Sequence, residues 1–246
     1  MSASTQLSIS EIKREAKDQL SGRWREAILL HLIPVAIAVL FAGGIYGLDL
    51  MSLTRLYNTG EQVDLVVSFL VTFISIGISF TLLDMVRSRE FVIQPLQHSV
   101  QIFSKKYFIP IFIIQMLQVV FVTLWSFLFI IPGIIKSYSY SQAFFIYKDR
   151  RNSQPEEFPT SLECITESRE MMNGHKLELF VLHLSFIGWH LLEAFTLGIA
   201  ALYVRPYLNT AEAVFYNKLA KEEHARYSQY KEHEADTADE ADFADF

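Results

Sequence analysis

The chain has 246 residues, a formal net charge of −6 and a hydrophobic content of 51% that includes 20 Phe. A mean hydropathy of +0.25 argues against a water-soluble domain, because the apolar residues come in blocks too long for buried strands. The single cysteine, Cys164, excludes an intrachain disulfide and a cysteine-based metal cluster. Nine of the 27 carboxylates fall between Glu222 and Phe246, so the negative charge describes a tail.

Residues 1–26 predict an amphipathic helix on the cytoplasmic membrane surface. Ser8 and Glu11 have the spacing of a capping box. Apolar residues then recur on one face among five cations, at Ile12, Ala16, Leu20 and Trp24. We expect anionic lipid to attract these cations, and a solvated helix that packs on nothing is the alternative. The segment is too polar for a removable signal peptide.

Six stretches are apolar enough to be membrane spans, for which a bilayer core of about 30 Å requires about 20 helical residues. These stretches are residues 27–47, 63–86, 107–131, 134–147, 177–195 and 198–216. Pro132 and Gly133 should form the break between the third and fourth helices, and one kinked helix over 107–147 is the alternative. The expected fold is an all-α polytopic bundle of six transmembrane helices, formed by residues 27–220.

Two shorter patterns lie at the ends of these spans. Gly43 and Gly47 form a Gly-x-x-x-Gly pair that would let another helix pack closely. A second capping box at Thr160 and Glu163, with Asn173-Gly174 as a stop, predicts one short helix before the fifth span.

The Lys and Arg residues predict the orientation of the six spans. With the N-terminus inside, 18 of the 21 cations fall on the cytoplasmic side and only Arg55 falls outside. The remaining two, Lys136 and Arg205, lie within spans. We therefore expect a multi-pass protein of the bacterial cytoplasmic membrane with both termini in the cytoplasm. Residues 221–246 are rich in Glu, Asp and Ala and are expected to be a disordered acidic tail.

Several spaced motifs resemble the bacterial integral-membrane family catalogued as domain of unknown function 975. They are Ile130-Ile131-Pro132-Gly133-Ile134-Ile135-Lys136, Ser168-Arg169-Glu170-Met171-Met172-Asn173-Gly174, Leu184-Ser185-Phe186-Ile187-Gly188-Trp189 and Pro206-Tyr207. The resemblance runs from about Ile9 to Leu219. It implies a multi-helix membrane fold without an established activity, so it assigns no catalytic residue. A distant similarity to the membrane domain attached to some glycerophosphodiester phosphodiesterases assigns none either.

Ionisable residues inside the last two spans are the candidate functional groups, because charge in a membrane is costly unless it is paired or hydrated. If the chain turns near Leu197 and Gly198, Glu212 lies level with His183, and Glu193 lies within reach of Arg205. We hypothesise that these four form one polar track, to which Lys136 is a further candidate. The structural alternative is that the pairs simply hold the two helices together.

No phosphate loop, zinc-protease motif or nucleophile elbow is present in the sequence. We expect no cofactor, no metal, no nucleic-acid partner and no enzymatic activity. Two functions remain. The first is a non-enzymatic envelope module whose partners are the lipid bilayer and, as candidates, other membrane proteins. The alternative is a small transporter that uses the polar track. The sequence leaves the oligomeric state and any substrate open.

Overall fold

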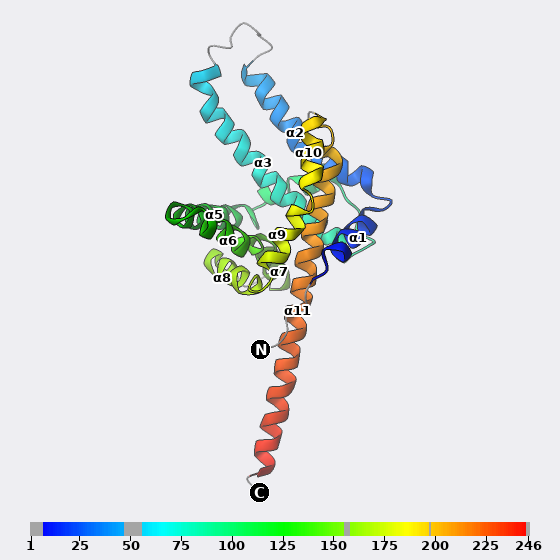
Figure 1. Cartoon of the computed structure of the whole chain (residues 1–246), viewed down its shortest axis with the longest axis vertical. Coiled ribbons are helices and arrows are strands. Elements are labelled where there is room, and N and C mark those ends of the chain that lie inside the picture. Colours follow the sequence, from blue (N-terminus) through cyan, green and yellow to red (C-terminus); the bar gives the residue numbers. More distant parts are fainter. Residues whose placement is uncertain (1–6, 47–55, 155–157, 197, 245–246) are drawn as a thin grey trace.

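The computed structural model describes residues 7–46, 56–154, 158–196 and 198–244 (Figure 1). Within these ranges the chain is helical and has no strand, so the all-α expectation is confirmed for this part. Side-chain surroundings are described throughout these ranges except at residues 37–46, 56–67, 226 and 230–244.

Two groups of helices form the upper part of the molecule. α2 (Trp24–Tyr46) packs beside α3 (Leu56–Arg87), and both rise from the body in Figure 1. α9 (Lys176–Leu184) and α10 (Ile187–Phe195) follow the upper part of α11 (Ala201–Ala244). The lower part of α11 continues alone below the body.

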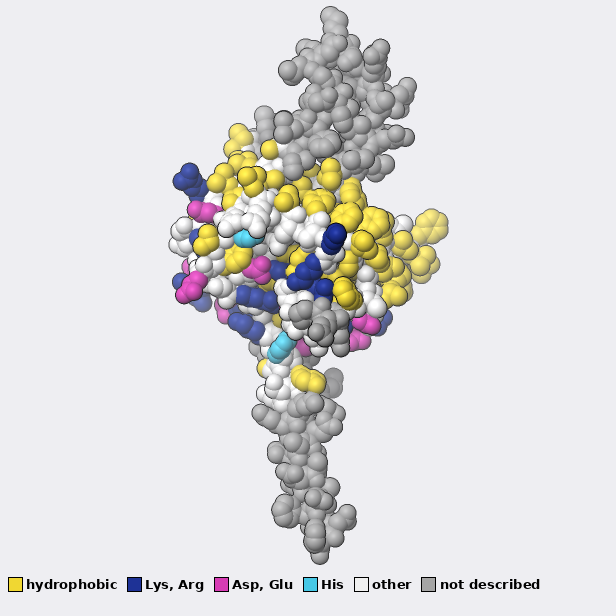
Figure 2. Space-filling view, turned by 180° about the vertical axis from the view of Figure 1, so that it is seen from behind, with side chains coloured by type: hydrophobic (Ala, Val, Ile, Leu, Met, Phe, Trp, Pro, Cys, Tyr) yellow, Lys and Arg dark blue, Asp and Glu magenta, His cyan; other side chains and the backbone are white. Residues whose placement is uncertain are grey.

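A helical hairpin leaves the body sideways. α5 (Phe108–Leu128) and α6 (Ile130–Tyr140) pack against each other and project crosswise to α11 in Figure 1. From behind, Figure 2 shows the same projection covered by hydrophobic side chains, with charged side chains gathered lower on the body. The hairpin is therefore the most apolar protrusion of the part of the chain that the two views describe.

Short helices close the lower body around a core of aromatic side chains. They are α1 (Ile9–Leu20), α4 (Pro95–Ser99), a 3-10 turn (Gln101–Phe103), α7 (Ala143–Ser153) and α8 (Ser161–Met171). Phe80 from α3, Phe145 and Tyr147 from α7, and Phe215 and Tyr216 from α11 are buried here. The Phe145 and Tyr216 rings stack with centroids 4.9 Å apart, so the core joins three helices that are distant in sequence.

Three described segments are long and apolar enough to cross a membrane, which identifies the chain as a membrane protein. They are Ser68–Arg87, Phe108–Leu128 and Lys176–Phe195, with mean hydropathies of 2.0, 2.1 and 1.3. Of the six predicted spans, these correspond to the second, third and fifth. Part of the first span lies outside the residues whose surroundings are described. Six spans therefore stay a prediction.

The predicted helix break at Pro132 and Gly133 is wrong by three residues. The break falls at Phe129, whose extended backbone separates α5 from α6. Pro132 is then the third residue of α6, where a missing amide donor costs nothing because first-turn amides have no intrahelical partner. The predicted fourth helix over 134–147 is also divided, because α6 ends at Tyr140 and α7 begins at Ala143.

The apolar face of α1 packs on the protein itself, and the expected position of this helix on the membrane surface stays a prediction. Ile12, Ala16 and Leu20 are fully buried, and α1 packs mainly on α11. The predicted capping box is wrong, because Ser8 makes no side-chain cap and Glu11 instead bonds Lys218 of α11. The Glu11 carboxylate, which the capping box requires, therefore forms an ion pair with a residue of another helix instead.

The prediction for residues 160–174 is confirmed, and the last helix extends into the tail. α8 begins with the predicted capping box, in which Thr160 and Glu163 bond each other's backbone amides. It ends before Asn173, and Gly174 has a positive φ of 93°. α11 continues as a helix to Ala244, and the disorder expected of residues 221–246 stays a prediction. No Gly or Pro interrupts residues 221–244, and the helix is already started by the packed part of α11.

Candidate functional site

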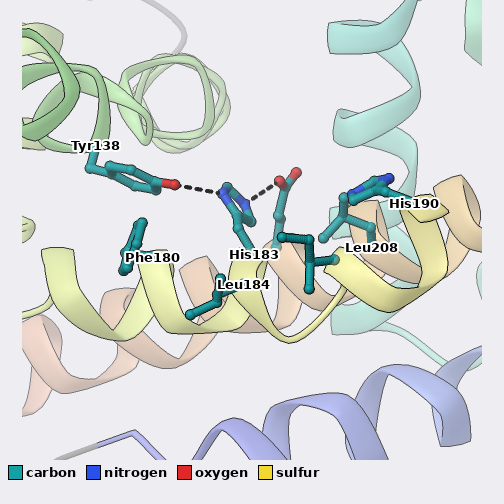
Figure 3. A pocket seen from close by; sticks show the side chains of 8 residues that line it. Tyr138, Phe180, His183, Leu184, His190 and Leu208 are labelled. Atoms are coloured by element: carbon teal, nitrogen blue, oxygen red, sulfur yellow. Dashed lines mark hydrogen bonds and ion pairs between the residues drawn. The ribbon is translucent and has the colours of Figure 1, made fainter. Parts of the chain in front are cut away.

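Three helices bring Tyr138, His183 and Glu212 together in one pocket. Nε2 of His183 lies 2.8 Å from Oε1 of Glu212, and Nδ1 lies 3.3 Å from the Tyr138 hydroxyl (Figure 3). Apolar side chains from Phe180, Leu184, Ile187 and Leu208 form the walls, and His190 lies at the far end. The cavity has a volume of about 320 Å³.

The turn between α10 and α11 sets the height at which these residues meet. Gly198 has a φ of 89°, a left-handed conformation that glycine adopts without steric cost, and it lies between the two helices. The chain then returns alongside itself. Depth matching from this turn predicted that His183 and Glu212 would lie level, and the 2.8 Å distance confirms it.

Hydrogen bonding constrains the chemistry of this group of three. The Glu212 carboxylate can only accept, so Nε2–H of His183 donates to it. Among the described residues, Oε2 of Glu212 accepts no hydrogen bond, and the Glu212 side chain, which is 30% exposed, lines the cavity. The site therefore offers a hydrogen-bond acceptor, with histidine rings beside it, to a ligand that enters between apolar walls.

The rest of the predicted polar track does not form a connected path among the described residues. Glu193 lies 3.5 Å from Nδ1 of His190 and not beside Arg205, which is exposed and makes no ion pair. Lys136 is on the hairpin, where its ammonium lies 4.7 Å from the centre of the Trp125 ring. The predicted Glu193–Arg205 pair does not form among the described residues, because His190, three residues earlier on α10, lies beside the Glu193 carboxylate instead.

The predicted helix-packing glycines cannot be compared with the structure. Gly47 lies outside the described residues, and Gly43 lies in the part of α2 whose surroundings are not described. Gly133, predicted only as a breaker, has a packing role instead. A Cβ atom at Gly133 would lie 2.9 Å from Cα of Ser126. Only glycine at position 133 therefore allows α5 and α6 to lie this close together.

A buried contact between His31 and Asn209 was missed by sequence reasoning. Nδ1 of His31 lies 2.7 Å from the Ala27 carbonyl, and Nδ2 of Asn209 lies 3.1 Å from Nε2. The ring therefore donates from Nδ1 and accepts at Nε2, which is the neutral form. The signal in the sequence was His31, the only basic or acidic residue of the segment 27–47, which requires a polar partner from another helix.

The strongest polar contacts lie at the lower end of α3 and were also missed. Lys148 of α7 is buried, and its ammonium lies 2.5 Å from Oδ1 of Asp84 and 2.6 Å from the Phe80 carbonyl. Burial lowers the pKa of Lys148, against the opposing effect of Asp84. From the sequence, Lys148 is predicted only as one of the cytoplasmic cations, because the charged residues at 149–151 follow it and nothing there indicates a buried side chain.

Asp149, the next residue, continues this network to α11. Its carboxylate accepts two bonds from the Arg87 guanidinium, at 2.5 and 2.7 Å, and one from the Tyr216 hydroxyl at 2.7 Å. Arg87 also donates to Asn217. We name Asp84, Arg87, Lys148, Asp149, Tyr216 and Asn217 the basal network. It joins α3, α7 and α11 through fixed charges, so its role is to hold the body together.

No set of three or more metal-ligating side chains occurs within the described ranges. A family model described as "Protein of unknown function (DUF975)" matches residues 7–154 and 128–223. No curated protein and no solved structure matches the chain.

Proposed function

We propose that this chain, which belongs to the DUF975 family, is a non-enzymatic multi-pass module of the bacterial cytoplasmic membrane that binds membrane lipid. The binding site in this proposal is the pocket between α6, α9, α10 and α11. Both termini lie in the cytoplasm. Support for the orientation comes from the cations, because 18 of 21 then lie on the cytoplasmic side.

One observation carries the lipid-binding function: a cavity with apolar walls contains a single cluster of polar side chains. A volume of about 320 Å³ is within the usual size range of small-molecule sites, which combine apolar walls with a few polar groups that orient the ligand. Leu184 and Ile187 are about half exposed at its rim. An occupant can therefore enter from the side, with its apolar part in contact with these residues.

The depth of the pocket also favours a lipid. Glu212 is six residues from Lys218 on α11, and His183 is seven residues from Lys176 on α9. At a rise of 1.5 Å per residue, both lie roughly 9–11 Å from the lysine-bearing end of their helices. Since lysines mark the headgroup level, this is the depth at which lipid headgroups give way to acyl chains.

Lipid retention by purified protein tests this function. The protein would be extracted with its native lipid and analysed by native mass spectrometry as wild type, Glu212→Gln and His183→Phe. Glu170→Gln, on the exposed surface of α8, is the matched control. Loss of a charge-assisted hydrogen bond costs about 1.5 kcal/mol, so bound lipid should fall roughly tenfold in the two pocket variants only. Equal retention in all four proteins would contradict the proposal.

A transporter is the second candidate, and one observation favours it. His183 and Glu212 can exchange a proton, and their contact lies between largely apolar helices. Proteoliposomes that carry a pH-sensitive dye would report proton movement after an imposed gradient. Flux that is present in wild type and absent in Glu212→Gln would support transport over lipid binding.

A further inference from the structure

The α5–α6 hairpin has an entirely apolar tip. Phe127, Phe129, Ile130 and Ile131 surround the turn, and Phe127 is 91% exposed. Only 11% of the Phe108–Leu128 segment is buried, against 61% of Ser68–Arg87. A hairpin whose turn reached the outer aqueous phase would expose these side chains to water. The tip therefore requires an apolar surrounding that the described part of the chain does not supply.

The direction of the hairpin opposes a full crossing. Tyr138 contacts His183, which fixes the root of the hairpin at the level of the pocket. From there it runs crosswise to α11 and not beside it (Figure 1). α6 has only 11 residues, about 16 Å of rise, before the chain turns at Ser141 and Gln142 into buried α7. This return path is about half of a hydrocarbon core.

The hairpin also carries interfacial side chains along its length. Lys136 is its only charged residue, and its ammonium lies over the Trp125 ring. Lys and Trp are both favoured at the level of lipid headgroups. A cavity of about 290 Å³ on the same hairpin is lined by the polar side chains of Gln115, Gln118, Thr123 and Ser137 together with Val119, Val122 and Tyr140. One polar side and a surrounding apolar surface fit an element that lies along an interface.

We propose that the α5–α6 hairpin is a re-entrant element that lies within the cytoplasmic leaflet, where its tip contacts acyl chains and does not reach the outer face. The proposal rests on the membrane location and orientation in the proposed function. Its base carries Lys105 and Lys106 before α5 and Lys148 and Arg150 in α7, so both ends leave the leaflet on the side where cations are retained. The predicted third and fourth spans then become one membrane element without an outer loop.

Thiol labelling in intact cells tests this arrangement. Cys164 would be replaced by Ala, and a single cysteine introduced as Phe129→Cys or Ile130→Cys. Ile199→Cys, next to the turn between α10 and α11, is the control for the outer side, and Phe158→Cys is the control for the cytoplasmic side; both side chains are at least 70% exposed. A membrane-impermeant maleimide should label Ile199→Cys on intact cells and Phe158→Cys only after permeabilisation. A lipophilic maleimide should label both tip variants in membranes.

The tip variants distinguish the possible outcomes. We expect at least a tenfold lower rate of labelling from outside at the tip than at Ile199→Cys. A rate equal to that of Ile199→Cys would show that the hairpin spans, and would overturn the proposal. Protection from the lipophilic reagent in membranes, lost in detergent, would show that a protein covers the tip and would also overturn it. If Phe158→Cys is labelled on intact cells and Ile199→Cys only after permeabilisation, the proposed orientation is wrong. The rate at the hairpin tip is then compared with that of Ile199→Cys after permeabilisation, and equal rates would again show that the hairpin spans.

Discussion

The ion pair between Lys148 and Asp84 should be asymmetric, in that removing one partner costs more than removing the other. The Lys148 side chain is 3% exposed and the Asp84 side chain is 33% exposed, although they lie 2.5 Å apart. Asp84→Asn leaves a buried ammonium without its hydrogen-bonded carboxylate, and among the described residues only Asp149, which does not bond it, then offsets the charge. Lys148→Met leaves a carboxylate that water can reach and that still lies near Arg87.

The magnitudes follow from this difference in exposure. Breaking a buried pair so that a charge stays buried costs about 3–5 kcal/mol, and we take about 3 for Asp84→Asn because the site is open at one end. The partly exposed carboxylate left by Lys148→Met should cost about 1 kcal/mol. The double variant should resemble Lys148→Met alone, since no buried ammonium then remains, which gives a coupling energy of about 3 kcal/mol in magnitude.

Thermal unfolding of the purified protein in one detergent measures these values. At about 2–4 °C per kcal/mol for a chain of this size, Asp84→Asn should lower Tm by about 6–12 °C and Lys148→Met by about 2–4 °C. Asp18→Asn, on the exposed side of α1, is the control for the same chemical change and should leave Tm unaltered. A Lys148→Met variant that is less stable than Asp84→Asn would refute the reasoning, because the buried charge would then not be the costly one.

Three further predictions concern other parts of the molecule. Gly133→Ala should destabilise the hairpin despite the higher helix propensity of Ala, whereas Gly188→Ala, with open space around it, should not; thermal unfolding would compare them. Burial raises the pKa of Cys164 to about 12, so the native thiol should resist an aqueous maleimide at pH 8 until the protein unfolds. The hydrogen bond with Lys218 holds the pKa of Glu11 below its ordinary value of 4.5. The contribution of the Glu11–Lys218 hydrogen bond to docking of α1 is therefore complete above pH 4.5 and is lost as the pH falls through the lowered pKa of Glu11. Limited proteolysis should then cut α1 faster at the lower pH. An unchanged rate of cleavage would contradict this prediction.

A local pattern predicted the start and the end of α8 correctly. The capping box at Thr160 and Glu163 begins α8, because its two hydrogen bonds lie within one turn and need no partner from elsewhere. The same motif at Ser8 and Glu11 failed, because Lys218 competes for the carboxylate. A local rule therefore holds where no distant group of opposite charge reaches the same atoms.

The pairing of helices was predictable only where one short turn joins them. His183 and Glu212 could be matched by counting from the turn at Gly198, because rise per residue is constant along both helices. The contact between Lys148 and Asp84 crosses 64 residues and three intervening helices. No count along the sequence gives their relative height, so that contact appears only after the chain is folded.

The amino-acid sequence by itself determined that long apolar helices dominate this chain, where most of them lie and which ionisable residues share a depth in the last hairpin. Only the tertiary structure decided that α1 turns Ile12, Ala16 and Leu20 toward protein and that α5 and α6 run crosswise to α11. The physical reason is that an apolar side chain gains similarly from leaving water whether it meets lipid or protein. Hydrophobicity therefore predicts which residues avoid water, and the packing of distant helices decides what they contact instead.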